Sequence, residues 1–112
     1  MDDIRKWDQA ISCFQLPAPQ KLAVDNFWKH CRGFPLPRVE GPVSEEPGVR
    51  FSYSIESAFL ECEIYPSGLC DWFFTDFYNP IGDDMVEVPI DIIIEKLIER
   101  FEWIHEKESE TH

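Results

Sequence analysis

The sequence predicts an α+β fold in which an antiparallel β-meander of three or four strands is combined with two N-terminal helices and a C-terminal helix packed on the sheet. Apolar residues recur at helical spacing near both ends, they alternate with polar residues in the middle, and turn residues separate the alternating runs. The 112 residues suffice for one modest core, which favours a single domain. Its expected segments are a helical part (1–32), a proline-rich connection (33–48), a sheet (49–88) and a C-terminal helix (89–108).

Two amphipathic helices are expected in the N-terminal part. The first runs from about Asp2 to Phe14 and has apolar residues three or four positions apart. The second begins at Pro19 or Gln20 and ends at Gly33, because proline suits a first helical turn and glycine a helix end. Its expected apolar side consists of Leu22, Ala23, Phe27 and Cys31.

An extended connection and a strand follow the second helix. Residues 33–48 contain four prolines and little periodicity, which is typical of a surface connection. From Val49 to Ile55 apolar and polar residues alternate, so this run is expected to be a strand with one face in the core.

The next two strands can be predicted to the level of register. Residues 65–68, Tyr-Pro-Ser-Gly, place proline at the second turn position and glycine where a left-handed conformation is needed. Pairing Tyr65 with Leu69 then gives one continuous apolar face, which a slip by one residue would destroy. The predicted apolar pairs are Ile64–Cys70, Cys62–Trp72 and Leu60–Phe74. The pairs on the opposite face are Glu63–Asp71, Glu61–Phe73 and Phe59–Thr75.

The remaining elements are a short strand and a long helix. Gly82, Asp83 and Asp84 are expected to form a turn before a strand at Met85–Val88. Pro89 then begins a helix that reaches about Lys107 and lies across the sheet. Its expected apolar stripe consists of Ile90, Ile93, Ile94, Leu97, Ile98 and Phe101.

The negative charge is confined to the second half of the chain. Residues 1–50 carry seven acidic and seven basic residues, whereas residues 51–112 carry fifteen and three, so the net charge of −12 lies entirely in the second half. Such a field repels nucleic acid and anionic membranes and steers basic partners to the protein. Two simpler interpretations remain open: an ordinary solvated acidic surface, or neutralisation within the monomer by Lys21, Lys29 and Arg32 of the second helix.

Two features of the acidic half point to a partner-binding surface. The predicted hairpin opposes two carboxylates beside an outward-facing phenylalanine. The last helix carries a self-repelling row of acids at mostly four-residue spacing, which Lys96 and Arg100 on the same side are expected to relieve only in part. Exposed aromatics rimmed by charge also mark interfaces, although a helix packed on that face would explain them equally well. The candidate partner-binding residues are Glu61, Glu63, Asp71, Phe73, Asp91, Glu95, Glu99, Glu102 and Glu106.

The sequence contains no recognisable catalytic motif. A nucleophile with its base, a tuned acid pair and a phosphate-binding loop are all missing, so we expect a non-enzymatic protein without a cofactor. The four cysteines form no Cys-x-x-Cys pair, and we expect reduced thiols rather than disulfides or metal ligands. The N-terminus lacks the apolar segment of a signal peptide, which favours a cytoplasmic location.

A family resemblance adds context to these inferences. Residues 35–37 (Pro-Leu-Pro), the strand after them, residues 63–68 and the run Trp72-Phe73-Phe74 resemble small bacterial and phage-borne proteins whose genes lie among toxin–antitoxin and defence genes. The resemblance covers about residues 20 to 78 and rests on turn and core residues. It implies a host-conflict setting in which small acidic proteins inhibit basic nucleases or nucleic-acid-guided complexes.

The leading hypothesis is therefore an inhibitor that occupies a basic, nucleic-acid-binding surface of another protein, and its most specific form is an anti-CRISPR or related anti-defence factor. Carboxylates four residues apart on a helix are separated by about 6 Å along its axis, a spacing comparable to that of phosphates along one strand. One alternative is an antitoxin- or immunity-like module that binds through exposed aromatics. A further alternative is a self-associating structural subunit.

Overall fold

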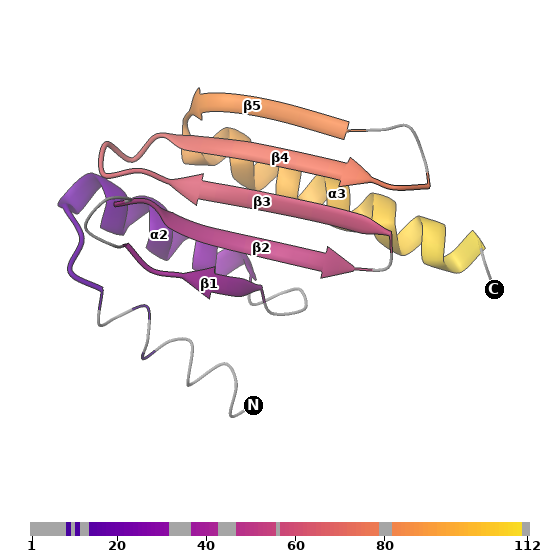
Figure 1. The fold of residues 1–112 in the computed structure, drawn as a ribbon, viewed down its shortest axis with the longest axis horizontal. Coiled ribbons are helices and arrows are strands. Elements are labelled where there is room, and N and C mark those ends of the chain that lie inside the picture. The colour runs from indigo at the N-terminus through magenta and orange to yellow at the C-terminus, as the bar shows by residue number, and fades with distance from the viewer. Residues whose placement is uncertain are drawn as a thin grey trace.

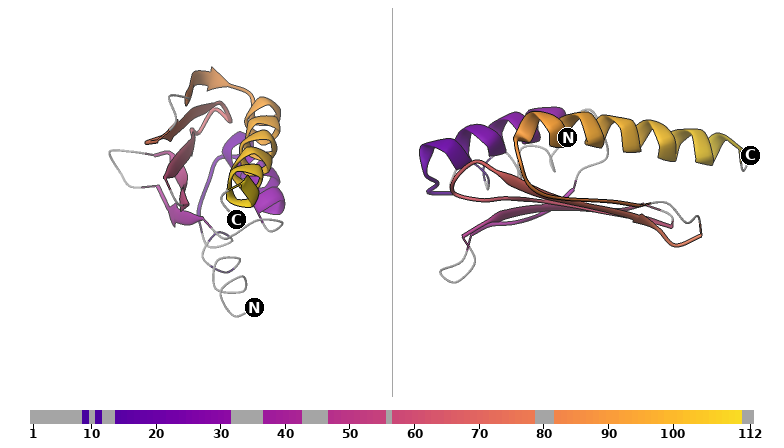
Figure 2. Two further views of the ribbon diagram at one scale, coloured as in Figure 1. Left: turned by 90° about the vertical axis from the view of Figure 1, so that its right-hand side faces the viewer. Right: turned by 90° about the horizontal axis from the view of Figure 1, so that it is seen from above.

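The computed structural model describes residues 9, 11, 14–31, 37–42, 47–55, 57–78 and 82–110, with side chains of the last range up to Ile104. Five antiparallel strands form one meander sheet in the order β1-β2-β3-β4-β5. Helices α2 and α3 both lie against the same face of this sheet (Figures 1 and 2). The strands are β1 (Arg38–Glu40), β2 (Val49–Ile55), β3 (Ala58–Ile64), β4 (Cys70–Asp76) and β5 (Gly82–Val88), and the helices are α2 (Ala18–Cys31) and α3 (Ile90–Glu110).

The α+β class is confirmed, but the element count differs from the prediction. The sheet has five strands instead of three or four. The expected first helix, residues 2–14, lies mostly outside the described residues. Within it the structure shows Gln9 and Ile11 as helical, and Ile11 is buried. Within the described part of the chain, neither helix is long and apolar enough to cross a membrane.

The additional strand, β1, lies in the segment that was expected to be an extended connection along the surface. Val39 pairs with Phe51, and Glu40 pairs with Arg50, so β1 lies beside β2 at the sheet edge. Three residues among prolines give no periodic pattern of their own. Their pairing satisfies backbone groups of β2 that would otherwise form an open edge.

The β3–β4 hairpin has the predicted register throughout, including Cys62 opposite Trp72 and Glu63 opposite Asp71. The Tyr65 amide donates to the Leu69 carbonyl at 2.9 Å, and Gly68 has a φ of 88°. Only glycine adopts this left-handed conformation at little cost, so the turn residue and the side-chain pattern select the same pairing.

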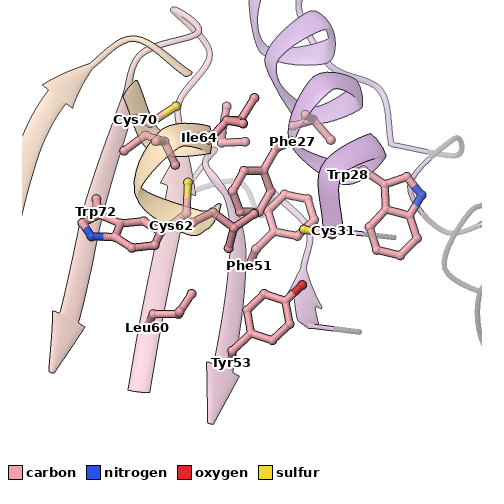
Figure 3. Close-up of a cluster of buried hydrophobic side chains, with 14 of the residues drawn as sticks. Phe27, Trp28, Cys31, Phe51, Tyr53, Leu60, Cys62, Ile64, Cys70 and Trp72 are labelled. Atoms are coloured by element: carbon pink, nitrogen blue, oxygen red, sulfur yellow. The ribbon is translucent and has the colours of Figure 1, made fainter. Parts of the chain in front are cut away.

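The core lies between the inner sheet face and the two helices (Figure 3). Phe27 of α2 packs on Phe51 of β2 with ring centroids 4.8 Å apart, and Tyr53 meets the ring of Phe101 in α3 edge-on at 4.8 Å. Aromatic contacts of this kind join each helix to the sheet and add to the gain from apolar burial.

Helix α2 corrects one predicted core position. Leu22 was expected on the buried side but is 74% exposed, because it lies about 200° around the helix from fully buried Val24. Gln20 is buried instead, and its side-chain amide donates to the carbonyls of Pro47 at 2.7 Å and Ile64 at 2.9 Å. This polar side chain anchors the start of α2 to the entrance of β2 and the end of β3.

The predicted turn at residues 82–84 is also wrong, because β5 already begins at Gly82. Asp83 pairs with Phe74 across the ladder, and its side chain faces α3. In α3 the expected stripe is buried except at its margins, where Ile98 is 37% exposed. Arg100 occupies a buried position beside Phe101.

Candidate protein-binding surfaces

The structure divides the predicted partner-binding residues between two sides of the molecule. Side chains alternate along a strand, so Glu61, Glu63, Asp71 and Phe73 point away from the inner face formed by Cys62, Trp72 and the other core residues. We call this the outer sheet face, and neither α2 nor α3 covers it (Figure 2, right). The acidic residues of α3 lie on the other side of the sheet, so the predicted residues do not form one continuous surface.

Arg50 is the main charged residue of the outer sheet face that the sequence did not single out. It lies opposite Glu63, and its Nη2 and Nε atoms are 2.9 and 3.1 Å from Oε1 of that carboxylate. Its Nε atom is also 3.3 Å from Glu61, and Nη1 is 3.5 Å from Glu40. Hydrogen bonding to Glu63 raises the pKa of Arg50. A cation of β2 therefore joins three carboxylates from the two neighbouring strands, β1 and β3, and reduces the negative field at this end of the sheet.

A sequence signal for this contact exists. Only Glu56 and Ser57 separate the alternating runs of β2 and β3, and a two-residue link between strands sets their register. Applying that rule would have placed Arg50 opposite Glu63.

The expected opposition of Glu63 and Asp71 is present, but each carboxylate has its own partner. The Tyr65 hydroxyl donates to Oδ2 of Asp71, and the Glu87 amide donates to Oδ1 at 3.0 Å. The hydrogen bond to Asp71 also raises the pKa of Tyr65. The repulsion that sequence reasoning assigned to this pair is therefore relieved inside the protein.

Exposed aromatic rings occupy the other end of the outer sheet face. Phe73 is 43% exposed and lies beside half-buried Phe59, with ring centroids 6.3 Å apart. Phe77 and Tyr78, just beyond the end of β4, are 77% and 87% exposed. Sequence reasoning expected a possible covering helix here, and within the described residues both helices lie on the opposite face.

The segment that carries Phe77 and Tyr78 is held by a buried carboxylate. Asp76 is 8% exposed, and its Oδ1 accepts hydrogen bonds from the Ser57 hydroxyl and the Tyr78 amide, both at 2.9 Å. The Phe77 amide also donates to the Ser57 carbonyl at 3.0 Å. These bonds hold the backbone that presents the two rings.

The acidic row of α3 faces solvent. Asp91, Glu95, Glu99 and Glu102 are all exposed, and the backbone at Glu106 continues the helix. Lys96 pairs with Glu99 at 3.3 Å. Among the side chains that the structure describes, no cation lies within ion-pair distance of the other three. The row therefore keeps most of its negative charge.

Arg100 does not relieve this row, although it belongs to the same helix. Its Nε and Nη2 atoms contact the two carboxylate oxygens of Asp83 at 2.6 and 2.7 Å, and its guanidinium carbon lies 4.6 Å from the centroid of the Phe74 ring. The bidentate contact lowers the pKa of Asp83. A charge that sequence reasoning assigned to the surface thus links α3 to β5 inside the molecule.

The lysine ion pair that the structure shows on α2 does not neutralise the acidic half of the chain. Lys21 lies 3.5 Å from Asp25 on the same helix, four residues further along. Arg32 lies outside the described residues.

The cysteines that the structure describes carry free thiols. Cys31, Cys62 and Cys70 are buried, and burial raises the pKa of Cys31 to about 12. Burial also raises the pKa of Cys62, whose thiol lies near Cys70. Across the described ranges, no three His, Cys, Asp or Glu side chains are grouped as metal ligands are.

A scan of protein-family models, a search of curated proteins and a search of solved structures found no match to this chain.

Proposed function

We propose that this protein is a small acidic, non-enzymatic inhibitor that uses α3 to occupy a basic surface of another protein where nucleic acid normally binds. The observation that carries the proposal is the exposed carboxylate row of α3. Three of its acids, Asp91, Glu95 and Glu102, have no described cation within ion-pair range. An anti-CRISPR or related anti-defence factor is the most specific form of this function.

The geometry of the row supports mimicry of a phosphate backbone. Asp91, Glu95 and Glu99 follow one another at four-residue intervals, which corresponds to steps of about 6 Å along the helix axis. The helix is held rigidly because Leu97 and Phe101 are buried against the sheet. A rigid row of charges loses little conformational freedom on binding a rigid basic groove.

The test begins with affinity capture from lysate of the bacterial host, washed at low and high salt and repeated with excess DNA. Affinity for the captured protein is then measured with a charge-reversal variant, Glu95→Lys with Glu102→Lys. We expect the affinity to fall by about tenfold or more, because lysines then face a basic surface.

A matched control carries the same charge change on the outer sheet face. The variant Glu40→Lys with Glu61→Lys should bind within about twofold of the original chain, because both side chains lie on the sheet face that α3 does not cover. Equal losses in both variants would show that only the net charge matters. Binding that resists salt, DNA and the α3 reversal would refute the proposal.

A second candidate function is an antitoxin- or immunity-like module that docks through exposed rings. The specific observation in its favour is the exposure of Phe73 together with Phe77 and Tyr78, on a segment held by Asp76. This mode predicts weak salt dependence and strong sensitivity to truncation of Phe73.

A further inference from the structure

The β4–β5 ladder presents the same cross-strand pair of residue types on both faces of the sheet. Phe74 lies opposite Asp83 on the inner face, and Phe73 lies opposite Asp84 on the outer sheet face. Successive residues of a strand point to opposite sides, so the two pairs are neighbours in the ladder and lie on opposite faces of the sheet.

The inner pair already binds a guanidinium group. Arg100 lies over the Phe74 ring at 4.6 Å from its centroid and forms a two-pronged contact with Asp83 at 2.6 and 2.7 Å. A planar guanidinium can satisfy both groups together, because its flat face stacks on the ring while its edge donates to the carboxylate. The molecule therefore shows how this ladder arrangement holds an arginine.

The outer pair has the same two groups without a described cation. Phe73 is 43% exposed and Asp84 is exposed, whereas both arginines on the described part of this face are engaged elsewhere. Arg38 pairs with Glu40, and Arg50 joins Glu40, Glu61 and Glu63. Neither α2 nor α3 covers the pair (Figure 2).

The surroundings of the outer pair favour a positively charged occupant. Glu61 lies opposite Phe73 on the side away from Asp84, so the ring stands between two carboxylates in one row across the sheet. The carboxylates on the described outer sheet face outnumber its two arginines; they are Glu40, Glu61, Glu63, Asp71 and Asp84.

We propose that the outer Phe73–Asp84 pair is a binding site for an arginine side chain of a partner protein. The guanidinium stacks on the Phe73 ring and donates two hydrogen bonds to Asp84, as Arg100 does with Phe74 and Asp83. Lysine fits less well, because its ammonium is a compact point charge that cannot stack and bridge in this way. This surface is separate from the acidic row of α3, so the inference goes beyond the proposed inhibitor function.

Nuclear magnetic resonance titration of the full chain tests the site. The probes are N-acetyl-arginine amide and N-acetyl-lysine amide, added to the ¹⁵N-labelled protein at low salt. We expect the arginine probe to shift the amide signals of Phe73, Asp84 and Glu61. Its affinity should exceed that of the lysine probe by about two- to fivefold.

Three variants make the test specific. Phe73→Leu should remove the preference for arginine, and Asp84→Asn should weaken the binding of both probes. Phe77→Leu is the matched control, because it removes an exposed ring that has no paired carboxylate in the ladder, and it should leave both affinities unchanged.

Several results would overturn the proposal: equal affinity for the two probes, shifts that are largest along α3, no shift with either probe, or an arginine preference that survives Phe73→Leu. The spectrum of each variant reports whether it is folded. Where Phe73→Leu does not fold, Asp84→Asn and the contrast between probes decide the question. Charge reversal on α3 should leave these shifts intact, so failure of this site and failure of the inhibitor function are distinguishable.

Discussion

Replacing Asp83 with asparagine should destabilise the fold far more than an ordinary surface substitution. The side chains of Asp83 and Arg100 are 16% and 9% exposed, and they join β5 to α3 through two short contacts. Asparagine keeps the shape but leaves the guanidinium charge buried without its counter-ion. Removing one partner of a buried pair costs about 3 kcal/mol, which is a large part of the 5–15 kcal/mol that stabilises a typical domain.

Urea unfolding followed by circular dichroism measures this cost, with Glu99→Gln as the control. Glu99 also has a basic partner, Lys96, but its side chain is 57% exposed. Loss of an exposed pair should change the free energy of unfolding by less than about 0.5 kcal/mol. The difference between the two variants isolates the effect of burial.

The pH dependence gives an independent check. Hydrogen bonding to Arg100 lowers the pKa of Asp83 from its ordinary value of 3.8, so the folded state binds this proton more weakly than the unfolded chain does. The stabilisation is therefore complete above pH 3.8 and is lost as the pH falls through the lower folded-state pKa. Asparagine does not titrate. The difference in the free energy of unfolding between the original chain and the variant should therefore be constant from neutral pH down to about pH 5, and it should shrink as the pH falls below 3.8. A cost no larger than that of Glu99→Gln, or a gap that persists unchanged in strong acid, would refute this reasoning.

Two further predictions concern the backbone and the thiols. Glu87 has a φ of 52°, so Glu87→Gly should stabilise the fold by about 0.5 kcal/mol, because the relief of backbone strain outweighs the added entropy of the unfolded chain. The neighbouring change Val86→Gly should instead destabilise the fold by roughly 1 kcal/mol. Chemical denaturation measures both changes in the free energy of unfolding, and the same sign for both would contradict this prediction. In a Cys13→Ser background, the three buried thiols should react with Ellman's reagent roughly a hundredfold or more slower in the native than in the denatured chain, because burial raises the pKa of Cys31 and Cys62. Rapid native reaction of more than one thiol would show that the core opens readily; the three are Cys31, Cys62 and Cys70.

Local chemistry explains why the hairpin could be predicted to the residue. Its turn needs proline and a left-handed glycine, and its strands need one unbroken apolar face, and both conditions select Cys62 opposite Trp72. Elements that depend on distant partners could not be predicted in this way. β1 is a strand only because β2 lies beside it, and Asp83 belongs to a strand that its contact with Arg100 helps to hold.

The same distinction holds for the candidate surfaces. Helical periodicity correctly predicted an exposed acidic row on α3. Sequence reasoning treated Arg100 as part of that row, because periodicity gives no sign that a guanidinium will be stabilised inside by Phe74 and Asp83. Sequence reasoning also placed the α3 row and the acids of the hairpin in one binding surface. Charge counts along a chain do not show which side of a sheet each residue faces.

The placement of acids on opposite sides of the sheet limits how far their charges act together. The molecule measures 23 Å along its shortest axis, the direction that runs from the outer sheet face to the helices. Electrostatic interactions decay over about 8 Å at physiological ionic strength. At that ionic strength the acids of the outer sheet face and those of α3 therefore act as two nearly independent local fields. Each can be tuned by mutation without altering the encounter rate at the other.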